Sequence, residues 1–131
     1  MKIISFSWTT PALLAGRKTV TRRSWDAMYA TSFHAGELVA AYNRSQRFGG
    51  TKVAEIQLTS GPYAERVMDE PPEDFEGEGF AFYCENPHLI PRNAPAWLRD
   101  ITPENYRLRT VLGIADVLWV VRFRLVKVEA A

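Results

Sequence analysis

The sequence has very few residues that cross-link a chain or ligate metals. Its 131 residues include one cysteine, Cys84, and two histidines, His34 and His88. One cysteine excludes an internal disulfide, and one thiol with two imidazoles does not supply the usual ligand set of a structural zinc ion. We therefore expect a protein of a reducing compartment that binds no metal and needs no cofactor.

Long apolar runs are also missing. The N-terminal residues, MKIISF, lack the apolar stretch of a signal peptide, and no run approaches the roughly 20 residues that cross a bilayer. These absences predict a cytoplasmic protein without a membrane partner. The oligomeric state stays open at this stage.

The length and the aromatic content instead fit one folded domain. A chain of this size buries about two-thirds of the surface of its unfolded state without metals or disulfides. Four tryptophans, seven phenylalanines and five tyrosines supply the core. We expect a single domain that comprises residues 1–131.

Apolar periodicity and turn residues predict the elements of this domain. Alternation and β-branched residues predict strands at residues 2–8, 19–23, 37–43, 52–59 and 117–128. Prolines, caps and glycines predict helical segments at residues 10–15, 71–78 and 101–113. Because strands and helices do not alternate regularly, we expect an α+β fold whose antiparallel or mixed sheet curls into a small β-barrel.

Charge is distributed unevenly along the chain. The net charge of +1 argues against a general polyanion binder. However, residues 1–25 contain five cations and no acid, whereas residues 65–78 contain seven carboxylates and one arginine. Two arrangements stay open: the segments face one another across a site, or they neutralise each other on the surface.

The densest chemistry lies in the segment Gly16-Arg17-Lys18-Thr19-Val20-Thr21-Arg22-Arg23. It holds four cations and two hydroxyls directly after a predicted helix stop. One explanation is a solvated strand edge, which lysine and arginine protect from mispairing. The other is a ligand site.

The order of residues in this segment resembles a known signature. The pattern Gly-x-Lys-x-x-Thr-x-Arg is similar to that of the ASCH superfamily, small β-barrels related to the PUA domains of RNA-modifying enzymes. The match covers Gly16, Lys18, Thr21 and Arg23, and it extends to residues 4–15 and to Glu78-Gly79-Phe80. The resemblance implies a PUA-like β-barrel flanked by short helices, with residues 84–113 as a family-variable helical insertion.

The resemblance also implies that the signature lines a cleft in which Lys18, Thr21 and Arg23 meet the ligand. In a regular strand Thr21 and Arg23 share one side and Lys18 takes the other. Convergence therefore requires a bend or bulge, which we predict near Thr19.

Two roles stay open for Arg23. Its guanidinium suits a bidentate grip on phosphate, and it equally suits a structural pair with Glu76 or Glu78. For Lys18 we favour a functional role, because desolvation lowers the proton affinity of an amine.

The first functional hypothesis is an RNA- or nucleotide-binding module. Its basic cleft follows a backbone while an aromatic side chain stacks on a base. Trp25 is the stacking candidate, because strand parity assigns Trp8 to the core. The residues expected to contact RNA or a nucleotide are Gly16, Arg17, Lys18, Thr21, Arg22, Arg23 and Trp25.

The second hypothesis is an enzyme. Some compact ASCH proteins are amidohydrolases that remove the acetyl group from N4-acetylcytidine, and the resemblance assigns their catalytic roles to Lys18, Thr21 and Glu78. A deprotonated lysine would take the threonine proton, and the glutamate would pass protons to the leaving amine. Those hydrolases are shorter and lack the 84–113 insertion. Ribonuclease activity is a third possibility, but the sequence shows no histidine pair of the kind that usually performs the acid–base steps of RNA cleavage.

Overall fold

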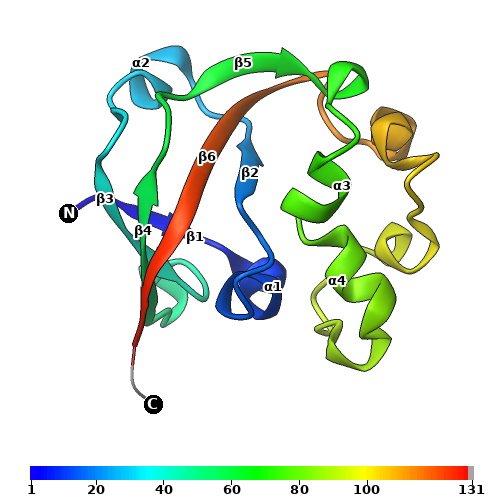
Figure 1. Cartoon of the computed structure of the whole chain (residues 1–131), viewed down its shortest axis with the longest axis horizontal. Helices are drawn as coiled ribbons and strands as arrows, with labels where there is room; N and C mark the ends of the chain where they lie inside the picture. Colours follow the sequence, from blue (N-terminus) through cyan, green and yellow to red (C-terminus); the bar gives the residue numbers. More distant parts are fainter. Residues whose placement is uncertain (130–131) are drawn as a thin grey trace.

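The computed structural model describes residues 1–129, with the side chain of Leu112 left aside. Residues 130 and 131, which the predicted domain includes, lie outside the described residues. Within this range six strands form one mixed sheet that curls into a half-barrel (Figure 1). The strands are β1 (Ile3–Ser5), β2 (Val20–Arg23), β3 (Leu38–Tyr42), β4 (Lys52–Leu58), β5 (Tyr63–Arg66) and β6 (Val117–Val128).

The order of strands in the sheet is β1-β3-β4-β6-β2, and β5 also pairs with β6. Strands β1 and β3 run parallel, whereas the other pairs are antiparallel. The predicted α+β fold with a small curled sheet is confirmed. The sequence pattern missed β5, whose burial pattern shows little of the alternation that predicts a strand.

Strand β6 holds the sheet together. Its first half pairs with β5 on one edge and with β2 on the other, and its second half pairs with β4. Its twelve residues make it long enough to pair with β5 and β2 in its first half and with β4 in its second half. Its pairing with β2 places Thr21 opposite Val121 and Arg23 opposite Trp119, so the end of the basic segment is fixed to the centre of the sheet.

Short helices surround the sheet. The α-helices are α1 (Thr10–Leu14), α2 (Ala27–Ala30), α3 (Asp74–Gly77) and α4 (Phe80–Glu85). The 3-10 helices are η1 (Ser7–Thr9), η2 (Gln46–Phe48), η3 (Val67–Asp69), η4 (Pro87–Leu89), η5 (Ala96–Asp100) and η6 (Tyr106–Leu112). Among residues 1–129, no helix is long and apolar enough to cross a membrane.

The predicted helical segments form, but not all of them keep the predicted bounds or helix type. Helix α1 follows the prediction, and Gly16 ends that turn with φ +75°. The segment predicted as a helix at 101–113 forms the 3-10 helix η6 instead, which Gly113 ends at φ +95°. Strand β1 is shorter than predicted because the chain enters η1 at Ser7, where φ is +47°.

Two apolar clusters form the interior. One lies within the curled sheet, and its largest buried side chains are Phe6, Phe33, Ile56 and Phe123. The other joins α1, α3, α4 and the 84–113 segment, around Phe75, Phe80, Tyr83, Leu98 and Tyr106. In Figure 1, α3 and α4 lie beside β2 and α1, so the edge of the sheet meets the helical part there.

Gly79 connects α3 to α4 at the point where the chain passes against α1. It has φ +94°, and a Cβ added there would lie 2.8 Å from the Cβ of Ala12. We expect Gly79→Ala to lower the free energy of unfolding by about 2–3 kcal/mol, since both the backbone and the packing are strained. Urea unfolding measures this loss.

Gly16→Ala is the matched control. Gly16 also has a positive φ, +75°, but an added Cβ would meet nothing within 4 Å. Its loss should be about 1 kcal/mol, from the backbone alone. Equal losses in the two variants would contradict the close packing of Gly79 against α1.

Candidate functional site

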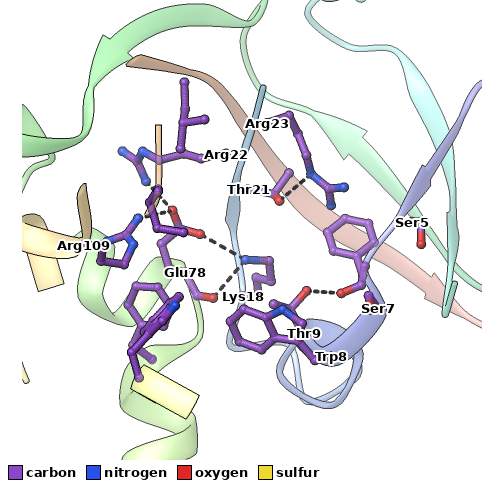
Figure 2. Close-up of a pocket in the computed structure, with 15 residues that line it drawn as sticks. Ser5, Ser7, Trp8, Thr9, Lys18, Thr21, Arg22, Arg23, Glu78 and Arg109 are labelled. Atoms are coloured by element: carbon purple, nitrogen blue, oxygen red, sulfur yellow. Dashed lines mark hydrogen bonds and ion pairs between the residues drawn. The ribbon is translucent and has the colours of Figure 1, made fainter. Parts of the chain in front are cut away.

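A pocket of about 250 Å³ opens where β2, the β1–α1 connection and the α3–α4 corner meet (Figure 2). Five of the predicted site residues line it: Lys18, Thr21, Arg22, Arg23 and Glu78. The other lining residues are Ser5, Phe6, Ser7, Trp8, Thr9, Phe80, Trp97, Arg109, Ile114 and Leu118.

Backbone hydrogen bonds place Lys18 beside Glu78, although the two are 60 residues apart. The Lys18 amide donates to the carbonyl of Ala12 in α1 at 3.2 Å. The next amide, of Thr19, donates to the carbonyl of Gly77 in α3 at 2.8 Å. The chain before β2 therefore lies between α1 and α3, and the Lys18 side chain enters the interior with 2% exposure.

The Lys18 amine makes two contacts with Glu78. Its Nζ donates to the backbone carbonyl at 2.9 Å and to carboxylate Oε1 at 3.2 Å. Burial lowers the pKa of Lys18, and the nearby Glu78 carboxylate offsets this only in part. Both of these contacts can be made by the ammonium, which has three N–H groups, or by the neutral amine, which has two.

The Glu78 carboxylate is held ionised by cations. Burial alone would raise its pKa, but Lys18, Arg22 and Arg109 together outweigh burial and lower it. Arg22 Nη1 donates to Oε2 at 2.7 Å, while Arg109 Nη2 lies 3.9 Å from the same oxygen. Glu78 is thus an anion whose two oxygens face different cations.

Arg22 lies at the centre of a buried ion-pair network. Its side chain is 3% exposed and contacts Glu65 at 2.8 Å, Asp74, and Glu78. Glu70 lies 3.5 Å from its Nε and pairs with Arg109 at 2.7 Å. Burial raises the pKa of Glu70 to about 7, although the two arginines act in the opposite direction.

This network combines features of the two arrangements of charge that the sequence left open. The basic and acidic segments neutralise each other directly, through Arg22 in the interior and through Arg17 on the surface. Both segments also contribute to the lining of the pocket. The pocket therefore borders a charge-balanced interior rather than a basic wall.

Thr21 and Arg23 form the other side of the site. Arg23 Nε donates to Thr21 Oγ1 at 3.0 Å, and the Arg23 guanidinium lies 5.4 Å from the centre of the Phe6 ring. Burial lowers the pKa of Arg23 to about 10, which leaves it charged near neutral pH. Within residues 1–129, no carboxylate lies at ion-pair distance from Arg23. Of the two roles left open for Arg23, the structural pair with Glu76 or Glu78 therefore does not form.

The convergence of Lys18, Thr21 and Arg23 on one pocket agrees with the prediction (Figure 2). The cause of this convergence differs from the bend or bulge that was predicted near Thr19. Regular strand geometry starts only at Val20, and β2 carries no irregularity in its pairing with β6. Lys18 therefore precedes the strand and is not bound by its alternation.

Three predicted ligand residues lie outside the pocket. Gly16 is an exposed turn residue. Arg17 pairs with Glu76 and, at 2.7 Å, with Glu85 on the surface. Trp25 stacks on Phe33, with ring centres 4.9 Å apart and planes inclined by 7°.

The sequence reasoning missed the aromatic residues of the site. Trp8, assigned to the core by strand parity, leaves the strand at η1 and lines the pocket. The early helix start at Thr9-Thr10-Pro11 was the signal that β1 ends before Trp8. Trp97 and Arg109 come from the 84–113 segment, and nothing in their local sequence marks them.

Removing the charge of Glu78 should destabilise the fold strongly. Glu78→Gln leaves the buried Lys18 and Arg22 without one of their anions, so we expect a loss of about 3 kcal/mol in the free energy of unfolding. Glu76→Gln removes the same charge from the exposed pair with Arg17 and should change stability by less than about 1 kcal/mol. Urea unfolding of the two variants provides the comparison, and similar losses would contradict a buried network.

No family model matches the sequence, and no curated protein matches it. Comparison with solved structures does find proteins of similar fold. A protein of Enterococcus faecalis V583 described under family DUF984 has a TM-score of 0.54 and 18% identity, over 95% of this chain and 74% of that one. An ASCH domain from Lactobacillus crispatus JV V101 has a TM-score of 0.53 and 15% identity, over 96% of this chain and 80% of that one. The chain therefore shares the fold of these two structures.

Proposed function

We propose that this protein is an amidohydrolase that removes a short acyl group from the exocyclic amine of a nucleobase, as in N4-acetylcytidine. The observation that carries the proposal is the buried pair of Lys18 and Glu78 in the same pocket as the Thr21 hydroxyl. These are the three residues to which the signature resemblance assigns catalytic roles. A base, a hydroxyl nucleophile and a carboxylate are the groups that acyl transfer needs.

The hydrogen bonds around Thr21 support its role as the nucleophile. Because Arg23 Nε donates to Thr21 Oγ1, the hydroxyl proton of Thr21 must point to another acceptor. We assign the role of that acceptor to Lys18 in its neutral form, because Lys18 lines the same pocket as Thr21. In the first step Oγ1 bonds to the amide carbon while the hydroxyl proton passes to Lys18 Nζ.

The remaining steps use the charged groups of the pocket. Arg23, which is cationic and has no carboxylate partner among the described residues, stabilises the oxyanion of the tetrahedral intermediate. When the C–N bond breaks, the leaving amine takes the proton from the Lys18 ammonium, and Glu78 stabilises that ammonium until then. Water then hydrolyses the ester on Thr21, which restores the hydroxyl and releases the carboxylic acid.

The distribution of charge favours this proposal over a module that binds a phosphate backbone. Of the four cations in the basic segment, Arg17, Lys18 and Arg22 are each paired with carboxylates. In this segment a polyanion would therefore meet Arg23 as the one cation without a carboxylate partner among the described residues, although unpaired cations supply most of the affinity for RNA. RNA or nucleotide binding stays the second candidate, supported by Arg23, which could hold a single phosphate.

Thr21→Val should abolish turnover while it preserves the shape of the side chain. With N4-acetylcytidine as substrate, we expect kcat/KM for cytidine release to fall by about 100-fold or more, because the nucleophile is missing. Thr19→Val is the matched control: Thr19 is exposed, lies two residues earlier and does not line the pocket. It should keep kcat/KM within about 2-fold of the wild type.

Two results would overturn the proposed function. One is the absence of cytidine release by the wild type at high enzyme concentration. The other is equal activity of the two valine variants. If turnover is absent and a short RNA binds with an affinity that falls with salt, the binding module is the better explanation.

A further inference from the structure

Trp97 lies in η5, within the segment that separates α4 from β6, and it borders two hollows. One is the pocket of Lys18 and Glu78. The other is a hollow of about 310 Å³ on the outer side of the segment, lined by Trp97, Asp100, Ile101, Asn105, Leu108 and Val111. Among the side chains that the structure describes, Trp97 is the one that lines both, so its indole forms part of a wall between them.

Neighbouring aromatic and cationic groups fix the position of this wall. The Trp97 ring lies 6.1 Å from that of Trp8 at 88° and 5.8 Å from that of Phe80 at 83°. The Arg109 guanidinium, held by Glu70, lies 6.0 Å from the Trp97 ring centre. Edge-to-face pairs of this kind each add to stability and restrict the ring orientation.

The segment is also tied to the opposite rim of the pocket. Asn93 Nδ2 donates to Ser7 Oγ at 3.0 Å, and Ser7 is the single non-glycine residue with positive φ among residues 1–129. Next to Trp97, the Leu98 side chain is 2% exposed within the second apolar cluster. The backbone of Trp97 is therefore held by the hydrogen bond of Asn93 on its N-terminal side and by the buried side chain of Leu98 on its C-terminal side.

The two hollows differ in chemistry. The pocket carries Lys18, Thr21, Arg23 and Glu78, whereas Ile101, Leu108 and Val111 make much of the outer hollow apolar. The pocket, at about 250 Å³, is smaller than the roughly 300–1,000 Å³ that usually accommodate a drug-sized ligand. A ring with a short acyl group fits such a volume, while a larger acyl group needs the space behind Trp97.

We propose that Trp97 is a specificity-determining residue: it limits the acyl group of the substrate to a small one by closing the pocket against the outer apolar hollow. This inference rests on the proposed amidohydrolase function. It predicts that truncation of Trp97 joins the two hollows, so that an apolar acyl group such as benzoyl reaches the space between Ile101 and Leu108.

The test compares the binding of two ligands. In a Thr21→Val background, which prevents turnover, calorimetry gives Kd for N4-acetylcytidine and N4-benzoylcytidine. With Trp97 present, the acetyl compound should bind at least about 10-fold more tightly. With Trp97→Ala, that preference should fall at least about 10-fold, and Trp97→Phe should give an intermediate ratio.

Trp25→Ala is the matched control, because Trp25 is also half-buried against aromatic rings but lines neither hollow. It should leave the ratio of the two Kd values unchanged. Circular dichroism of each variant establishes that it is folded, and Trp97→Phe keeps the test valid if Trp97→Ala does not fold.

The outcomes separate the inference from the function on which it rests. Turnover of N4-acetylcytidine by the wild type, with a Kd ratio that does not respond to Trp97, overturns the inference alone. A ratio that responds to Trp97 without any turnover overturns the amidohydrolase function and supports the wall. Absence of binding of either compound to any of the folded proteins overturns both.

Discussion

The contact between the Lys18 amine and Glu78 is the interaction on which the rest of the site depends. Removing an amine and a carboxylate from water costs several kcal/mol each, and mutual attraction alone often fails to offset this. Here the protein adds a backbone carbonyl for the amine and two arginines around the carboxylate. The pair is therefore stable only as part of a larger network.

The same network explains why a strongly basic sequence segment does not produce a basic surface. Arg22 engages carboxylates from β5 and from the α3 region, and Arg17 binds two more on the surface. The pocket offers a ligand Arg23 without a carboxylate partner among the described residues, Lys18 with a lowered pKa, the Thr21 hydroxyl and aromatic walls. This pairing within the pocket is the reason why we propose a small planar substrate rather than a phosphate backbone.

Local sequence patterns predicted much of the fold. The alternation of β4 and β6, the Pro11 helix start and the Gly16 stop act within a few residues, and the structure has them close to the predicted bounds. The prediction was weakest in residues 84–113, where aromatic and proline residues favour no single period and 3-10 turns form instead.

The signature and its downstream glutamate motif identified four polar residues of the pocket, Lys18, Thr21, Arg23 and Glu78, since their spacing carries the resemblance. It did not reveal their partners, because ion pairs such as Arg22 with Asp74 join residues about 50 positions apart and depend on the tertiary fold. Strand parity assigned Trp8 to the core, and Trp8 packs against the second apolar cluster but also lines the pocket, because β1 ends before the alternation predicts. Trp25, the predicted stacking residue, packs on Phe33 instead.

The central claim is that Lys18 is a desolvated amine held by Glu78, and its pKa tests this claim most directly. Titration of the lysine side-chain resonances by NMR, with Lys18→Met for assignment, measures it. We predict a value below the ordinary lysine pKa of about 10.4, and a still lower value in Glu78→Gln, which removes the anion that favours the ammonium. A Lys18 pKa at or above the ordinary value would contradict the account.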